Sequence, residues 1–365
     1  MTKDEPISAS QMAVLFLSFM LGSAIINIPQ PLVEVAHNGA WVSILASFGF
    51  GMVLLTCVAF LYRKKPTYNL VDYSQQILGK WGSLVVIIPI LLLTLLQLSY
   101  IVIDIGGFFT NAMMRETPSY VFHFFVLFVA SLTVRAGIEV MARMFVLLLC
   151  YLIFFSVIVL LLTLPFYRFD HLFPVFPEGI KPVIHGFYIT AGFPYGEVVT
   201  FSLLLPLVHK LKNKKRSVEK ALFAALVLHI LLLLSSILCT IMALGPMAGS
   251  VKFSLFELAR LINIEEIITR IESLIGIALI VGSYMKATIM LFILKETLSQ
   301  VLNLKDHRIM IFPMTVISFL LTLTMHKNSI EFYDGVFIVL PLAIFFIYAV
   351  PLFFVTAVMV FKKSV

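Results

Sequence analysis

Charged residues are scarce in this chain of 365 residues. Asp, Glu, Lys and Arg together make up 12% of the sequence, whereas hydrophobic residues make up 61%. A soluble domain needs a wettable surface, and so few charges cannot provide one around a core of this size. The composition therefore excludes a soluble globular protein and indicates an integral membrane protein with many membrane spans.

Cysteine and the short motifs of common enzyme classes are also lacking. The three cysteines, Cys57, Cys150 and Cys239, fall in different apolar stretches without a CxxC motif, which predicts buried packing residues. HExxH, GxSxG, a Walker loop and GxGxxG after a strand are all absent. We therefore expect no enzyme activity, no metal and no cofactor.

Apolar runs of about 20 residues, long enough to cross a hydrocarbon core, recur along the whole chain. They predict an all-α membrane protein of about ten transmembrane helices, arranged as a single permease-like domain over residues 1–365. The predicted spans are residues 9–31, 40–62, 83–110, 119–134, 141–164, 183–206, 218–245, 270–297, 309–325 and 335–361.

Lysine and arginine residues gather on one side of these spans. That side carries both termini, and because basic residues are retained in the cytoplasm, both termini are predicted to be cytoplasmic. The net charge of +7 reflects this bias, so we expect no nucleic-acid binding. The basic cluster at residues 210–216 is interpreted as a membrane anchor, with contact to anionic lipid or a cytosolic partner as the alternative.

Two spans are interrupted by helix-breaking residues. Residues 22–31 end the first span with a glycine and two prolines, and residues 190–197, TAGFPYGE, interrupt the sixth. Backbone groups freed in this way are tolerated in a membrane only where they face protein, a cavity, an ion or a ligand. With ten spans the breaks fall in the first span of each half, which predicts an inverted repeat over about 9–164 and 183–361.

The two breaks and a polar stretch at residues 283–286 lie near the middle of their spans, so we expect them to meet. Small residues at these places either contact a ligand or allow close helix packing. The candidate ligand-binding residues are Gly22, Ser23, Asn27, Tyr100, Gly192, Phe193, Tyr195, Gly196, Ser283 and Thr288.

Two charged residues lie deep inside spans. Glu197 costs about 2.5–3.5 kcal/mol at the bilayer centre and needs a partner, a proton or a water-filled cavity. Lys286 could pair with Glu197, hold a ligand carboxylate, occupy the position of a bound cation, or extend toward the interface. Our hypothesis is that the two residues form an electrostatic switch or ion-coupling pair, and that their pairing differs between the ligand-free and ligand-bound states. The alternative is a purely structural salt bridge.

The third span carries a polar stripe. Gln97, Asp104 and Asn111 recur at seven-residue spacing with Tyr100 on nearly the same face, so this face should look into the bundle. Asp104 lies toward the outer end and is interpreted as a rim carboxylate that reaches water, with ligand access, gating or ion coupling as the alternative. His229 is expected to be a neutral, hydrogen-bonded packing residue rather than a proton relay.

Residues 255–271, between the seventh and eighth spans, show a helical pattern with one apolar and one charged side. This segment either lies on the outer membrane surface or caps an outer vestibule.

The broken first span, the sequence GFPYGE at 192–197, the basic loop that follows and FELAR at 256–260 together resemble the B subunits of spore germinant receptors, the spore germination permease family. The resemblance covers essentially the whole chain. It implies a LeuT-like five-plus-five fold of the amino acid/polyamine/organocation transporter superfamily. It also implies the inner membrane of a bacterial spore, an A subunit and a lipoprotein C subunit as partners, and a small nutrient ligand, commonly an amino acid, that triggers ion release.

Two other functions are compatible with these residues. One is an autonomous proton- or cation-coupled amino-acid symporter, and the other is a ligand-gated ion pathway along the polar stripe of the third span. In each case we expect a ligand carboxylate to face freed amides of residues 22–27, with its ammonium toward carbonyls of the sixth span. A sugar or an inorganic ion remains open as the ligand.

Overall fold

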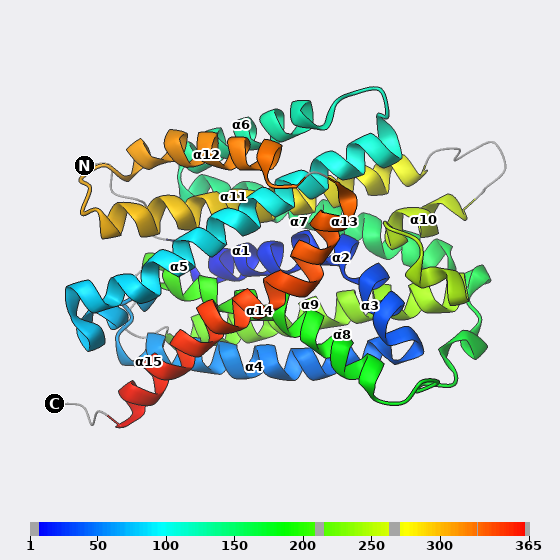
Figure 1. Ribbon diagram of the computed structural model, residues 1–365, viewed down its shortest axis with the longest axis horizontal. Helices are drawn as coiled ribbons and strands as arrows, with labels where there is room; N and C mark the ends of the chain where they lie inside the picture. Colours follow the sequence, from blue (N-terminus) through cyan, green and yellow to red (C-terminus); the bar gives the residue numbers. More distant parts are fainter. Residues whose placement is uncertain (1–6, 209–214, 263–270, 327, 362–365) are drawn as a thin grey trace.

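The computed structural model describes residues 7–208, 215–262, 271–326 and 328–361. Within these ranges the chain forms helices and their connections, with one isolated β-bridge between Ile7 and Val208 (Figure 1). Nine helical stretches of the described chain are long and apolar enough to span a membrane. The first helix begins and the last helix ends at the same end of the bundle (Figure 1), as predicted from the basic residues.

The first five predicted spans are all helical, and the first is divided into three pieces. Their bounds are α1 (Ala9–Gly22), α2 (Ala24–Asn27), α3 (Pro29–Ala36), α4 (Ala40–Lys64), α5 (Leu70–Phe108), α6 (Ser119–Ala136) and α7 (Ile138–Leu162). Helix α5 starts with a capping box, in which Asn69 and Asp72 each accept the other's backbone N–H at 2.9 Å. It is kinked at Gly79, where φ is 73°, so its long second part begins close to the predicted position near residue 83.

The second half contains another broken span and a final helix with two wide turns. Its helices are α8 (Lys181–Gly192), α9 (Lys215–Leu244), α10 (Ser254–Arg260), α11 (Ile271–Val301), α12 (Ile311–Thr324), α13 (Ser329–Asp334), α14 (Leu340–Ile344) and α15 (Val350–Phe361). π-helical turns at Gly335–Val339 and Phe345–Ala349 join α13, α14 and α15 into one continuous span.

The sixth span is broken where the sequence predicts. Helix α8 ends at Gly192, and after Phe193 and Pro194 the chain continues as a 3-10 segment, Tyr195–Leu203. Proline has no backbone N–H to continue the helix, and 3-10 runs longer than about four residues are uncommon. This span is therefore no ordinary membrane helix, and it is the predicted span that lies outside the nine found by length and composition.

The break in the first span is milder. The chain keeps right-handed helical dihedral angles at Ser23 and Ile28, and α3 starts with Pro29. The amides of Asn27 and Ile28 donate to the carbonyls of Ser23 and Ala24 at 3.1 and 3.0 Å. The expectation that residues 22–27 offer freed amides to a ligand is therefore wrong for Asn27, whose amide is already used.

The two broken spans lie side by side at the centre of the bundle. Phe201 of the 3-10 segment packs edge-on against Phe16 and Phe19 of α1, with ring centroids 4.9 and 5.0 Å apart. Large apolar side chains face outward on the peripheral helices, for example Leu147 on α7. Cys150 of α7 is also exposed, so the prediction of a buried cysteine is wrong there, and Cys57 and Cys239 are only half-buried.

The predicted amphipathic segment is present as α10 within the described chain. Leu255 and Leu258 are fully buried against the bundle, while Arg260 is exposed and pairs with Glu257 at 3.0 Å. Helix α10 therefore caps this end of the bundle rather than lying apart on the surface. Residues 263–270, like residues 209–214 of the basic cluster, lie outside the described residues.

Candidate functional site

Two glycines bring the first and eighth spans into backbone contact. A Cβ atom on Gly282 of α11 would lie 2.6 Å from the carbonyl oxygen of Gly22, and a Cβ atom on Gly22 would collide with the Gly282 carbonyl. Only a residue without a side chain permits this approach. The contact places Lys286, one helical turn after Gly282, against the end of α1.

Lys286 and Glu197 form a buried ion pair. Both side chains are almost completely inaccessible, and the Lys286 ammonium also lies 4.1 Å from the ring centre of Phe193. Opposite charges in contact avoid most of the cost of an isolated charge in the membrane. The predicted meeting of the sixth and eighth spans is thus present in the structure, whereas the role of the pair as a switch stays a prediction.

A chain of hydrogen bonds connects this pair to the third and tenth spans. Gln97 Nε2 donates to the second oxygen of Glu197 at 2.9 Å, and the Tyr348 hydroxyl donates to Gln97 Oε1 at 2.7 Å. The hydroxyls of Tyr348 and Thr94 lie 2.8 Å apart. Both oxygens of Glu197 are therefore occupied. The polar stripe predicts that Gln97 faces inward, but no sequence signal singles out Tyr348 or Thr94.

Asp104 lies inside the bundle, contrary to the prediction of a rim carboxylate. The residue is only 8% exposed, and it accepts a hydrogen bond from Asn27 Nδ2 at 2.7 Å. Among the described residues it forms no ion pair. The prediction fails because other spans cover this part of α5. Asn27 of α2 bonds to Asp104 itself, and Phe332 of α13 packs against Tyr100 one turn earlier, with ring centroids 5.7 Å apart. Asn111, farther along the same stripe, is exposed.

A cavity of about 330 Å³ opens among these side chains, within the range of about 300–1,000 Å³ that is usual for ligand pockets. It runs from exposed residues such as Glu34 and Lys252 down to buried Phe193 and Glu197. It is lined by Ser23, Asn27, Gln30, Glu34, Gln97, Tyr100, Ile101, Asp104, Phe193, Glu197, Ser250, Lys252, Phe332, Tyr333, Val336, Phe337 and Leu340.

The mouth of the cavity is held by a polar cluster that sequence reasoning missed. Glu34 accepts hydrogen bonds from Gln30 at 2.7 Å and from the Tyr333 hydroxyl at 2.6 Å, and Gln30 also donates to the Gly249 carbonyl at 2.8 Å. The cluster joins α3, α13 and the connection before α10. Gln30 and Glu34 lie one helical turn apart directly after the first break. This spacing in the sequence could have indicated that the two side chains contact each other.

Comparison with known proteins identifies the family of this chain. A family model described as spore germination protein, or spore permease, matches residues 6–330. The chain belongs to this family. The spore germination protein KB of Bacillus subtilis is 26% identical over 342 residues, which cover 93% of this chain and 90% of that protein. The spore germination protein XB of Bacillus anthracis is 21% identical over 278 residues, which cover 75% of each.

Solved structures show that this spore germination family member has the LeuT-like fold predicted from the resemblance. MhsT in complex with L-phenylalanine superposes with a TM-score of 0.71 at 14% identity, covering 98% of this chain and 89% of that one. A Na⁺-coupled sialic acid symporter gives a TM-score of 0.70 at 10% identity, covering 95% and 79%. Family and fold are those of membrane transporters or receptors, and the chain is a multi-pass membrane protein.

Six of the residues predicted for the site line the cavity: Ser23, Asn27, Tyr100, Asp104, Phe193 and Glu197. Lys286 does not line it, but contacts it through Glu197. The structure thus brings together polar and aromatic residues from the first, third and sixth spans. The matching breaks predict the meeting of the first and sixth spans, and the polar stripe predicts that the third faces inward.

The predicted glycines lie outside the cavity lining and serve close packing instead. A Cβ atom on Gly192 would collide with Pro341, and one on Gly196 with Ile344, both on the tenth span. Gly22 packs against α11 in the same way. The prediction that these glycines contact a ligand is not supported, because neighbouring helices already occupy the space beside them.

Three further candidates also pack away from the cavity. Tyr195 is fully buried, and its ring lies edge-on to His229 with centroids 5.4 Å apart. Ser283 is buried on α11, and Thr288 donates its hydroxyl to the Tyr284 carbonyl of the same helix at 2.8 Å. These positions shape the helix contacts behind the ion pair.

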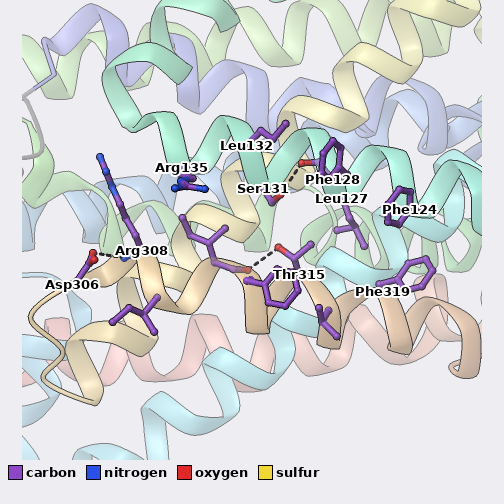
Figure 2. Close-up of a pocket in the computed structure, with 14 residues that line it drawn as sticks. Phe124, Leu127, Phe128, Ser131, Leu132, Arg135, Asp306, Arg308, Thr315 and Phe319 are labelled. Atoms are coloured by element: carbon purple, nitrogen blue, oxygen red, sulfur yellow. Dashed lines mark hydrogen bonds between the residues drawn. The ribbon is translucent and has the colours of Figure 1, made fainter.

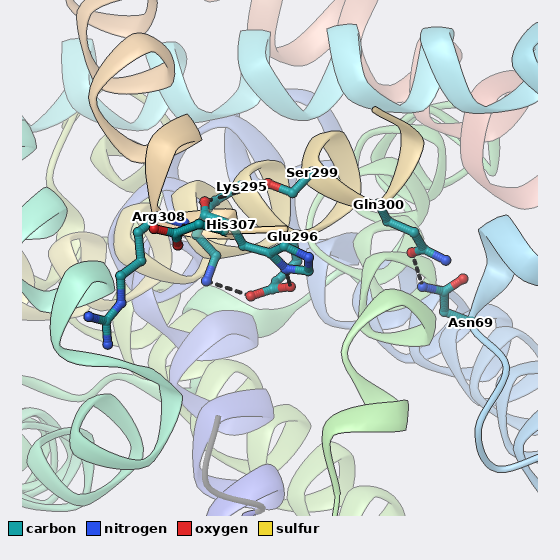
Figure 3. A network of polar contacts seen from close by, with 8 residues as sticks. Asn69, Lys295, Glu296, Ser299, Gln300, His307 and Arg308 are labelled. Atoms are coloured by element: carbon teal, nitrogen blue, oxygen red, sulfur yellow. Dashed lines mark hydrogen bonds and ion pairs between the residues drawn. The ribbon is translucent and has the colours of Figure 1, made fainter. Parts of the chain in front are cut away.

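Another polar network lies at the opposite end of the bundle (Figure 3). Gln300 of α11 accepts from Asn69 at 2.6 Å and donates to Asp72 at 2.8 Å, which ties α11 to the start of α5. Nearby, Glu296 pairs with Lys295 at 2.5 Å and contacts His307 at 2.6 Å. The Glu197–Lys286 pair and this network therefore lie in succession between the 330 Å³ cavity and the end where α1 begins.

Proposed function

We propose that the chain is the ligand-binding membrane subunit of a spore germinant receptor, located in the inner membrane of the spore with both termini in the cytoplasm. An A subunit and a lipoprotein C subunit are its expected partners, and a small nutrient is its ligand. Family membership and relatives named for spore germination support this role. The observation that carries the proposal is the cavity with the buried carboxylate of Asp104, whose described partner is a neutral amide.

The cavity favours an amino acid as the ligand. The Asp104 carboxylate would receive the ammonium group, the exposed ammonium of Lys252 would face the ligand carboxylate, and Phe193 and Phe337 would contact an apolar side chain. This arrangement replaces the expectation of freed amides at residues 22–27. A ligand of this kind bound to a protein of the same fold, MhsT with L-phenylalanine, supports the choice.

Ligand binding would act through the floor of the cavity. Glu197 lines the cavity and is held at the same time by Lys286 and Gln97. A ligand whose ammonium is held by Asp104 would fill the cavity above Glu197, so a bound ligand favours whichever arrangement of the pair accommodates it best. The bond from Tyr348 to Gln97 would pass such a change to the last span, from which partner subunits could read it.

Neutralising Asp104 tests the binding site. We expect Asp104→Asn to weaken amino-acid binding about 10- to 100-fold, because a hydrogen bond to a charged group is worth about 1.5–3 kcal/mol. Scintillation proximity with a labelled amino-acid panel on the purified chain in liposomes measures the affinity. Asp170→Asn, an exposed carboxylate outside the cavity, is the matched control. Equal affinities for both variants, with binding retained, would refute the assignment of Asp104.

A second candidate function is a proton-coupled amino-acid symporter, because a buried Glu–Lys pair can exchange a proton as well as change partners. Uptake by the same liposomes with and without a pH gradient separates the two. Saturable binding without accumulation is expected for the receptor subunit. Gradient-driven accumulation that Glu197→Gln abolishes would instead establish the symporter.

A further inference from the structure

A second cavity, of about 670 Å³, lies between α6 and α12 and away from the ligand cavity (Figure 2). Aromatic and aliphatic side chains form most of its walls, with Phe124 of α6 and Phe319 of α12 at one end. Ser131 and Thr315 also line it, but each hydroxyl donates to a carbonyl of its own helix at 2.7 Å. Over most of its length the groove therefore offers an occupant only rings, methyl groups and methylene groups.

Two arginines stand at the other end of this groove. Arg135 and Arg308 both line it and are exposed, and Figure 2 shows them together at the end opposite Phe124 and Phe319. Neither guanidinium forms a hydrogen bond or ion pair with the part of the chain that the structure describes. Asp306, also at this end, accepts the backbone N–H of Arg308 at 2.9 Å. The three side chains leave this end with a net positive charge.

The dimensions of the groove match one leaflet of a bilayer. At 1.5 Å per residue, Arg135 lies roughly 16 Å along α6 from Phe124. This is about half of a hydrocarbon core of about 30 Å. Arg308, in the 3-10 turn before α12, and Phe319 of α12 have the same separation in sequence, and α12 runs in the opposite direction. The groove thus has a cationic end at the membrane surface and an apolar wall that reaches toward the bilayer centre.

We propose that the groove between α6 and α12 binds an anionic phospholipid of the surrounding bilayer. Its phosphate lies between Arg135 and Arg308, and an acyl chain follows the groove toward Phe124 and Phe319. A basic pocket between membrane helices is a recognised form of lipid headgroup site. A water-soluble ligand would gain little from walls this apolar, whereas a phospholipid satisfies the charge and the apolar wall together.

Lipid-specific fluorescence quenching tests this site. The reporter is Phe128→Trp in the groove wall, in a chain whose own tryptophans are replaced (Trp41→Phe, Trp81→Phe). The matched reporter is Leu147→Trp, on the exposed face of α7 close to Arg143, whose guanidinium is already paired with Glu139. Both full-length variants are placed in vesicles of phosphatidylcholine and phosphatidylglycerol in which one of the two lipids is brominated.

We expect the groove reporter to be quenched more strongly by brominated phosphatidylglycerol than by brominated phosphatidylcholine. Each arginine should favour the anionic lipid by about fivefold, whereas Leu147→Trp should show almost no preference between the two lipids. Adding Arg135→Gln and Arg308→Gln should remove the preference without changing the elution profile or the unfolding temperature. Equal quenching by the two lipids, or a preference that survives the loss of both arginines, would overturn the proposal. So would weak quenching by both lipids relative to Leu147→Trp, since the groove would then be covered by protein.

Discussion

Lys286→Met alone is expected to lower the free energy of unfolding by about 3–5 kcal/mol, because it leaves the carboxylate of Glu197 buried without its cationic partner. Gln97 still donates to this carboxylate, but a neutral amide does not balance a full charge. Glu197→Gln alone should cost a similar amount by leaving the ammonium of Lys286 unpaired. Chemical or thermal unfolding of the purified chain in detergent measures both effects.

The double variant Glu197→Gln/Lys286→Met should recover most of this loss, since neither charge remains to be buried. Arg260→Met, which breaks the exposed pair with Glu257, is the control and should cost no more than about 1 kcal/mol. Additive losses in the double variant would show that the two side chains do not act as a coupled pair.

The same double variant separates stability from signalling. If the ion pair only supports the fold, the double variant should bind the ligand and respond to it as the parent does. If ligand binding rearranges the pair, the double variant should assemble normally and yet lose or alter its germination response. Spores that carry each variant, scored for germination at increasing amino-acid concentration, give the comparison.

Features that depend on a single span could be predicted from the sequence. Hydropathy alone locates the helices, because a residue in lipid must satisfy its backbone within its own segment. Gly192, Pro194 and Gly196 reveal the break in the sixth span for the same reason. Glu197 and Lys286 could be singled out because charges are rare at mid-membrane, and their meeting followed from similar depth in two spans.

Features that depend on contacts between spans were not predictable in this way. Asp104 was misplaced because its exposure depends on α2 and α13, which come from opposite ends of the chain. The bond between Glu34 and Tyr333 joins α3, after the first predicted span, to α13, before the tenth, and nothing in either segment predicts the other. A small residue such as Gly196 can face a ligand or a neighbouring helix, and only the helix packing distinguishes the two.

Gly282→Ala is expected to lower the free energy of unfolding by about 1–3 kcal/mol, and Gly282→Val by more, because the added atoms meet the backbone of α1. A backbone carbonyl cannot rotate away as a flexible side chain can, so α1 and α11 must separate. Gly49 of α4 provides the control, since a Cβ atom there would have no atom within 4 Å. Gly49→Ala should be neutral or stabilising by up to about 1 kcal/mol, as in any open helical position.

The position of Gly282 makes this variant informative about the site as well as the fold. Lys286 lies one turn further along α11, so a shift of α11 away from α1 also moves its ammonium relative to Glu197 and Phe193. Ligand affinity should therefore fall together with stability in Gly282→Ala, and it should stay at the parental value in Gly49→Ala. A Gly282→Ala chain that is destabilised and yet binds its ligand normally would mean that the ion pair tolerates displacement, and that the glycine contact serves the packing of the bundle alone.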